Sequence, residues 1–304
     1  MSAFEPHWLE LRESADTGAR AAGAIETMLR IDDAEGPLRI LDLGAGTGAN
    51  LRFLAPRLGG RQEWLLVDAD CRLLDAVPLA MGAWAARMGY RRTRETESIA
   101  VEGPGFHCRF RLLELDMAAR FADLPIEGQR LVTASALLDL ISEPWADGLL
   151  RRCAAAGTEV LFALSYDGRI TFEPVLSDDA RVLGLVNRHQ RSDKGFGPAM
   201  GPSASERTHA MLVDQGYRVE RRPSDWRIDS DGAGLQTALI EGLAAAAAAM
   251  APDSEARLTS WCRRRLEFVK LGTSRVTVGH RDLLGCLGNH RIESEVPAEQ
   301  GRVL

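Results

Sequence analysis

The chain has 304 residues, and its 43 acidic side chains against 37 lysines and arginines give a formal net charge of −6 and an isoelectric point near 5.6. That length suffices for one large α/β domain or two smaller ones. The acidic balance argues against a general nucleic-acid-binding protein. The five cysteines are scattered and form no C-x-x-C pair, so neither a disulfide framework nor a zinc site is expected.

Membrane association is not expected from the sequence. No uninterrupted apolar run reaches the about 18 residues that a membrane span needs, and we find no cleavable apolar leader. We therefore expect a cytoplasmic protein that makes no membrane contact, holds no metal and acts as a monomer or a homodimer.

The first 36 residues are predicted to form a helical cap, with one or two amphipathic helices over residues 4–30. Arg12, Asp16 and Arg20 recur at i, i+4 and i+8, so they share a face and can pair. Two interpretations stay open. The row is an exposed set of ion pairs that stabilises little, or the segment covers a ligand cleft where Trp8, Arg12 or Arg20 contacts a substrate, an arginine by binding a carboxylate.

Residues 38–43 are predicted to form a buried parallel strand, because this short apolar run ends in glycines. Gly44, Gly46 and Gly48 follow it and form a turn without Cβ atoms. Backbone of this kind can approach a ligand closely.

A helix over residues 50–58 and a second strand over 64–67 complete the unit, and this strand stops at Asp68. A carboxylate at the carboxyl end of a strand can hold the two hydroxyls of a ribose. The sequence therefore predicts a βαβ unit that binds a nucleoside.

Which nucleoside binds is ambiguous at this point. Residues 44–49 also satisfy the loose G-x-G-x-x-G/A pattern of dinucleotide-binding folds, and Asp68 lies about the expected distance downstream. Two features argue against a dinucleotide. Asp42 would repel a pyrophosphate but can orient the loop or accept from an ammonium, and the third glycine comes early, at Gly48. A nicotinamide oxidoreductase stays open as an alternative.

Residues 41–48 (L-D-L-G-A-G-T-G) and 67–70 (V-D-A-D) resemble the class I S-adenosylmethionine-dependent methyltransferases, and the resemblance covers residues 36–170 clearly and the rest loosely. It implies an α/β fold: a Rossmann-like, doubly wound, mostly parallel seven-stranded sheet with helices on both faces. It also implies S-adenosyl-L-methionine as the cofactor and S-adenosyl-L-homocysteine as the product. The cofactor contacts that we expect are Asp42, Gly44, Ala45, Gly46, Gly48, Asn50, Asp68, Ala69, Asp116, Met117, Ser135 and Ala136.

After the second strand, a crossover helix is predicted over residues 71–88 and a charged connector over 91–97. Residues 98–102 and 106–115 then predict a hairpin around Gly-Pro-Gly, and its second arm is the third core strand.

Two later strand ends are expected to reach the same site. Asp116 closes the third strand, where the resemblance implies a contact with the adenine amino group and places Met117 on the ring; an N-cap role for Asp116 is the alternative. The fourth strand ends between Ser135 and Asp139, beside the reacting methyl group. Asp139 is therefore a possible substrate contact.

A helix over residues 145–155 and a fifth strand over 159–164 follow, with Tyr166 as a further possible substrate contact. Beyond a helix over 178–188 comes a polar, glycine-containing stretch over 187–198, where we expect substrate selection.

Within this stretch, Asn187, Lys194 and Phe196 are possible substrate contacts. His189 is the predicted general base, because an imidazole titrates near neutral pH. A surface histidine at a helix end is the alternative.

The remaining predicted elements are a helix over 205–216, a sixth strand over 217–228, helices over 235–250 and 254–269, and a last strand over 273–278. The domains that we predict are the cap at 1–36, a methyltransferase domain at 37–290 with substrate-side insertions near 175–215 and 233–270, and a loose tail at 291–304.

The resemblance leads us to expect direct in-line transfer of a methyl group to oxygen or nitrogen of a small-molecule acceptor. Such a transfer needs near-attack geometry and exclusion of water rather than a metal or a covalent residue. His189, Asp139 or Tyr166 could take a proton from a hydroxyl or an amine. The alternatives are a methyltransferase acting on RNA or protein, and a protein that binds S-adenosylmethionine without transferring methyl.

Overall fold

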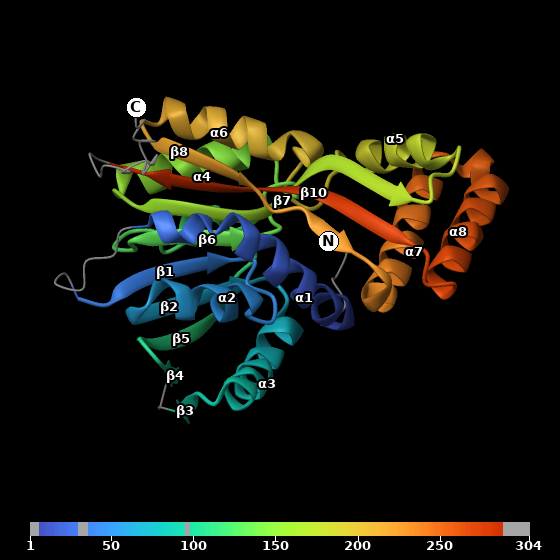
Figure 1. Cartoon of the computed structure of the whole chain (residues 1–304). Helices are drawn as coiled ribbons and strands as arrows, with labels where there is room; N and C mark the ends of the chain where they lie inside the picture. The colour runs from blue at the N-terminus through green and yellow to red at the C-terminus, as the bar shows by residue number, and fades with distance from the viewer. Residues whose placement is uncertain (1–5, 30–35, 95–97, 288–304) are drawn as a thin grey trace, which may run out of the picture.

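The structure, a computed structural model, describes residues 6–29, 36–94 and 98–287, so the predicted tail at 291–304 lies outside the described residues. Its centre is one ten-stranded sheet (Figure 1). The strands are β1 (Leu38–Leu43), β2 (Gly60–Asp68), β3 (Arg91–Arg94), β4 (Ile99–Gly103), β5 (Phe106–Glu114), β6 (Leu131–Ser135), β7 (Glu159–Glu173), β8 (Arg218–Pro223), β9 (Trp226–Ile228) and β10 (Arg275–Cys286).

The strand order is β3-β4-β5-β2-β1-β6-β7-β10-β8, with β9 paired to β10. The central strands β5, β2, β1, β6 and β7 are parallel, and β4 and β10 pair antiparallel with their neighbours. The expected mostly parallel Rossmann-like sheet is confirmed, but the predicted number of seven strands is wrong. Arg91–Arg94, predicted as part of a connector, forms the edge strand β3. Its charged side chains disfavour pairing of this open edge with another chain. The predicted sixth strand is divided into β8 and β9; between them the Ser224 hydroxyl donates to Asp282 while its backbone N–H donates to the carbonyl of His280.

The strands β7 and β10 are much longer than predicted, because they continue together as an antiparallel ribbon beyond the carboxyl ends of the parallel strands, where β9 also pairs with β10 (Figure 1). Their antiparallel pairing runs from Gly285 opposite Val160 to Arg275 opposite Glu173, with register shifts near Asp282. This ribbon carries most of the helices of the C-terminal half.

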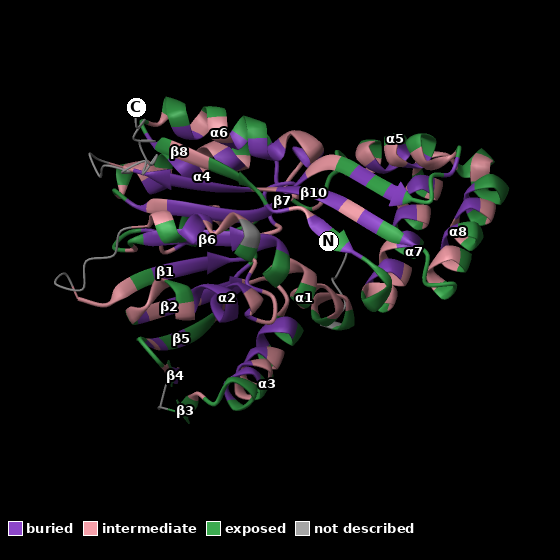
Figure 2. Cartoon of the chain, in the orientation of Figure 1, coloured by how far each residue is buried: buried purple, intermediate pink, exposed green. Residues whose placement is uncertain are grey.

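The helices and single turns are α1 (Pro6–Gly23), η1 (Ile25–Met28), α2 (Ala49–Leu58), α3 (Cys71–Met88), η3 (Phe121–Asp123), α4 (Glu143–Ala155), α5 (Asp179–His189), η4 (Gly201–Ser203), α6 (Ala204–Asp214), η5 (Ser230–Gly232), α7 (Ala233–Met250), η6 (Pro252–Ser254) and α8 (Glu255–Lys270). Helices α2 and α3 pack on one face of the sheet, and helices α4 and α6 pack on the other. Helices α5, α7 and α8 pack around the ribbon (Figure 1). Buried side chains therefore run along the central strands and into the ribbon (Figure 2).

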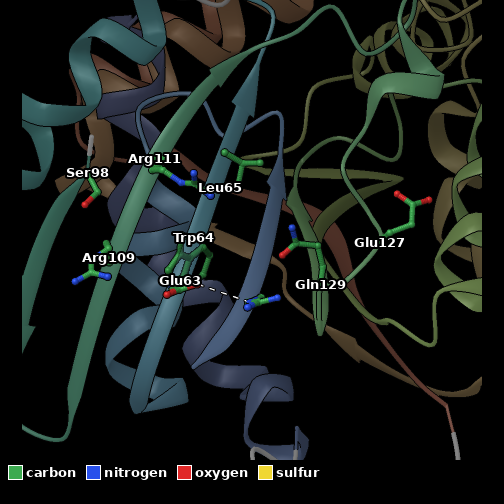
Figure 3. Close-up of a pocket in the computed structure, with 10 residues that line it drawn as sticks. Glu63, Trp64, Leu65, Ser98, Arg109, Arg111, Glu127 and Gln129 are labelled. Atoms are coloured by element: carbon green, nitrogen blue, oxygen red, sulfur yellow. Dashed lines mark ion pairs between the residues drawn. The ribbon is translucent and has the colours of Figure 1, made fainter. Parts of the chain in front are cut away.

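One part of the sheet has a bare face. The connection from β5 to β6 contains only the single turn η3, so no described helix covers the outer face of β5, β2 and β1 there. Arg109, Arg111, Glu63 and Arg39 point outward and line an open hollow of about 640 Å³ (Figure 3). The expected helices on both faces are present, and they leave this stretch uncovered.

One helix has the length and apolarity of a membrane span. Among the described residues it covers Ser230–Met250, which is 21 residues long. Its most apolar window has a mean hydropathy of 1.3, and 28% of that window is buried. Our expectation rested on uninterrupted apolar runs and passed over this helix. Core helices can have the same length and composition, and Ile240 and Leu243 pack here in one cluster with Trp261. A single helix of this kind is weak support for membrane insertion.

Candidate functional site

The glycine turn after β1 lies at the carboxyl end of the parallel strands. Gly44 and Gly46 have φ values of +64° and +54°, a region that side chains strain to adopt. A Cβ at Gly44 would lie 3.4 Å from Leu137, and one at Gly46 would lie 3.3 Å from Leu9 of α1. The turn therefore needs glycine for its backbone conformation, and at Gly46 a Cβ would also require the Leu9 side chain to shift slightly.

Asp68 fixes this turn against the end of β2. Its Oδ2 accepts from the backbone N–H of Gly46 at 2.8 Å, and its Oδ1 accepts from that of Asp70 at 3.0 Å. Asp70 in turn caps α3 by accepting from the Arg72 backbone N–H. A carboxylate in this position has lone pairs left for a ligand hydroxyl.

Behind the turn lies a buried polar network. Asn50 donates to Asp42 at 2.7 Å and to Thr133 at 3.2 Å, and Arg20 donates to Asn50 at 2.9 Å. Burial raises the pKa of Asp42 to about 7, although the hydrogen bond from Asn50 and the charge of Arg20 oppose that shift. The Oδ2 of Asp42 has no partner among the described residues. This network supports the turn from below.

A cavity of about 360 Å³ opens in front of the turn, within the roughly 300–1,000 Å³ of small-molecule sites. The predicted site residues that line it are Arg12, Gly44, Gly46, Asp68, Ala69, Asp116, Met117, Ser135, Ala136, Lys194 and Phe196. The predicted residues that are not among its lining are Asp42, Ala45, Gly48, Asn50, Trp8, Arg20, Asp139, Tyr166, Asn187 and His189.

The structure adds lining residues that the sequence did not single out: Leu9, Asp70, Cys71, Arg72, Leu73, Leu137 and Leu140. Four of them directly follow the predicted pair Asp68 and Ala69, so proximity in sequence could have found them. Leu9 gives no such signal, because only the packing of α1 over the turn brings it there.

Asp116 and Met117 form the far wall of the cavity. Asp116 Oδ1 accepts from the backbone N–H groups of Ala118 and Ala119 at 3.0 and 3.1 Å, so it also caps the turn that follows it. Trp145 donates to the carbonyl of Met117 at 3.1 Å. The ring of Trp145 meets Phe196 at 5.2 Å.

Helix α1 lies over the cavity through Leu9 and Arg12. Arg12 forms an ion pair with Asp16 at 2.9 Å, and its guanidinium lies 5.1 Å above the Trp226 ring. Trp226 also donates to Asp16 at 2.9 Å. These contacts join α1 to β9 and hold Arg12 at the cavity wall.

Asp139 and Tyr166 lie close behind this wall. Asp139 is buried, and its Oδ1 has no hydrogen-bond partner among the described residues. Burial raises its pKa to about 6. The Tyr166 hydroxyl donates to Asn187 at 2.8 Å, and Asn187 donates to the carbonyl of Gly168, so this pair joins α5 to the ribbon.

His189 ends α5 and contacts Lys194 rather than the cavity. Its Nδ1 lies 3.4 Å from Lys194 Nζ, which also donates to Ser192 at 3.0 Å. Burial and the charge of Lys194 both lower the pKa of His189. Nδ1 of His189 is positioned to accept from the Lys194 ammonium.

These features fit the cofactor that the sequence resemblance implies. A glycine turn, an acid at the end of the second strand and a wall at the end of the third surround one cavity at the carboxyl edge of a parallel sheet. The strand order is that of the Rossmann-like, mostly parallel α/β sheet that the resemblance implies.

No protein-family model matches the chain, and no curated protein matches it. Solved structures that resemble it include the cyclopropane synthase MmaA2 from Mycobacterium tuberculosis, with 12% identity and a TM-score of 0.44 over 88% of this chain and 82% of that one. A cyclopropane-fatty-acyl-phospholipid synthase-like protein from Lactobacillus casei has 14% identity and a TM-score of 0.48, over 89% and 91%. The YcgJ protein from Bacillus subtilis has 14% identity and a TM-score of 0.43, over 83% of this chain and 93% of that one. At these values the likenesses carry no argument about function, so the interpretation of the site rests on its own geometry.

Proposed function

We propose that the chain is an S-adenosylmethionine-dependent methyltransferase that acts on oxygen or nitrogen of a small-molecule acceptor. The observation that supports the proposal is that Asp68 accepts from the Gly46 backbone N–H and also lines the cavity. A cavity that continues from there to Leu140 and Phe196 supports room for an acceptor beside the cofactor.

When bound, S-adenosylmethionine supplies an electrophilic methyl group and leaves as the neutral S-adenosylhomocysteine. Asp68 would hold the ribose hydroxyls, and Asp116 with Met117 would hold the adenine. Helix α1 excludes water from the glycine turn, because Leu9 packs on Gly46. Asp139 is buried and does not line the cavity, so we assign it no direct contact with the acceptor proton.

Two alternatives from the sequence have weaker support. A macromolecular acceptor would need a wide approach, whereas Leu9 and Arg12 of α1 and Phe196 line this cavity from above. A protein that only binds the cofactor would need no lining beyond the residues around Asp68 and Asp116. The small-molecule acceptor, like a cytoplasmic location, is part of our proposal.

Replacement of Asp68 tests the proposal directly. We expect Asp68→Ala to weaken binding of S-adenosylhomocysteine by about 1.5–3 kcal/mol, because a charged hydrogen-bond acceptor is lost. Calorimetric titration measures it, and Asp75→Ala is the matched control, since Asp75 lies exposed on α3. Equal affinities in both variants would mean that the ribose lies elsewhere.

A further inference from the structure

Lys194 is one of two lysines in the chain, the other being Lys270 on α8, against 37 lysines and arginines together. It belongs to the loop between α5 and η4, which is fixed in place. Asp193 Oδ1 accepts from the backbone N–H groups of Gly195 and Gly197 at 2.7 and 3.0 Å. The loop is also bound to the segment after β6, because the N–H of Met200 donates to Ile141 at 2.9 Å. Lys194 is thus held by a rigid loop at the cavity wall.

The ammonium of Lys194 has three N–H donors, and two of them have neutral acceptors. Ser192 Oγ accepts one at 3.0 Å while donating its own proton to the carbonyl of His189 at 2.7 Å. His189 Nδ1 accepts the second at 3.4 Å. No carboxylate forms an ion pair with Lys194 within residues 6–29, 36–94 and 98–287. The third donor therefore remains for a ligand, and an anion there would offset the burial that lowers the pKa of Lys194.

The cavity separates its charges. Its carboxylates, Asp68, Asp70 and Asp116, lie at the strand ends where the nucleoside is expected, and Asp70 is already paired with Arg72 at 2.7 Å. Of the three cations in the lining, Arg72 lies at the same end as its partner Asp70, and Arg12 and Lys194 lie on α1 and on the loop after α5. Arg12 is next to the glycine turn through Leu9, and it is neutralised by Asp16. Lys194 lies on the loop whose end is hydrogen-bonded to the carbonyls of Asp139 and Ile141.

We propose that Lys194 binds an anionic group, a carboxylate or a phosphate, on the methyl acceptor, and that His189 and Ser192 position its ammonium for that purpose. This inference rests on the proposed methyltransferase function. It gives His189 a positioning role instead of the role of general base, because a nitrogen that accepts from Lys194 is not free to take the acceptor proton. The acceptor class is then a small acid that carries a hydroxyl or an amine.

The two lysines make the test direct. Protein labelled with [¹³C]lysine gives separate side-chain signals for Lys194 and Lys270, which the Lys270→Met variant assigns. With S-adenosylhomocysteine present, we expect inorganic phosphate or acetate to shift the Lys194 signal in a saturable way, and the Lys270 signal to stay unmoved. Sodium chloride at equal ionic strength is the control. Comparing the two anions distinguishes a phosphate from a carboxylate site.

The Lys194→Met variant should bind the effective anion at least about tenfold more weakly, while Lys270→Met should bind it like the wild type. Equal shifts of both lysine signals, or none, would overturn the anion site. The carboxylate that Lys194 binds could instead belong to the cofactor. This is tested with 5′-methylthioadenosine, which lacks the amino-acid carboxylate.

If Lys194→Met weakens binding of S-adenosylhomocysteine but not of 5′-methylthioadenosine, Lys194 binds the cofactor carboxylate and the acceptor assignment is overturned. Failure of the wild type to bind either nucleoside would instead overturn the proposed function along with it. Binding of the nucleosides with an unmoved Lys194 signal would overturn the anion site alone.

Discussion

Arg20 is the buried cation beneath the glycine turn. Its side chain donates to Asn50 and lies 3.9 Å above the Phe53 ring, and the charges of Asp282, Glu26, Asp16 and Asp42 surround it. Its predicted role as a substrate contact differs from this position, because a residue without exposed surface holds the fold rather than a ligand.

Removing this cation should strongly destabilise the protein. We expect Arg20→Met to lower the free energy of unfolding by about 3–5 kcal/mol, since it leaves buried carboxylates without a counter-charge. Arg151→Met is the control, because Arg151 pairs with Asp147 at the surface, and it should cost less than about 1 kcal/mol. Urea unfolding measures both, and similar losses would contradict the buried network.

Asp139 should make stability depend on pH. Burial raises its pKa from 3.8 to about 6, so the folded protein keeps a proton that the unfolded chain releases. As pH rises from about 4 to about 6, the wild type should therefore lose stability relative to Asp139→Asn, on the order of 3 kcal/mol, and the difference should then stay constant. Thermal unfolding of both proteins across this range measures it. A constant difference at every pH would mean that Asp139 is not buried as an acid.

At the scale of single elements, local signals decided which predictions succeeded. Helix α3 begins and ends where predicted because both of its caps are sequence-local: Asp70 accepts at the start, and Gly89 adopts a φ of +70° at the end. The strand β7 was predicted to end at Leu164, yet it continues. The Leu164 N–H donates to Asp282 at 2.7 Å, a partner far along the chain that no local pattern reveals.

The bare sheet face in Figure 3 could have been read from the sequence, because β2 and β5 alternate apolar and charged residues. Adjacent residues of β2 test it. Glu63→Ala should cost less than about 1 kcal/mol, since its pair with Arg39 is exposed and 3.8 Å long. Trp64→Ala should cost about 3–5 kcal/mol, since Trp64 is 2% exposed in the core. Denaturant unfolding distinguishes them, and a costly Glu63→Ala would mean that this face is covered.

At the scale of the whole molecule, the sequence predicted the cavity residues that lie in or near the glycine motif and the strand ends. It did not predict the elements that cover the cavity. Asp68, Gly46 and Met117 line the cavity as expected, because each directly follows or ends a core strand. The substrate side depends on α1 and on the loop of Lys194, whose positions follow from packing between segments distant in sequence. For that reason the contacts expected of His189 and Asn187 were not found at the cavity wall.

The most direct test of the central claim is parallel calorimetric titration of the purified chain with S-adenosylmethionine, S-adenosylhomocysteine and NAD. The geometry of Asp68 and the glycine turn predicts binding of the first two ligands and none of the third. Binding of NAD alone would contradict the assignment, because the same cavity would then serve a dinucleotide and the chain would be an oxidoreductase.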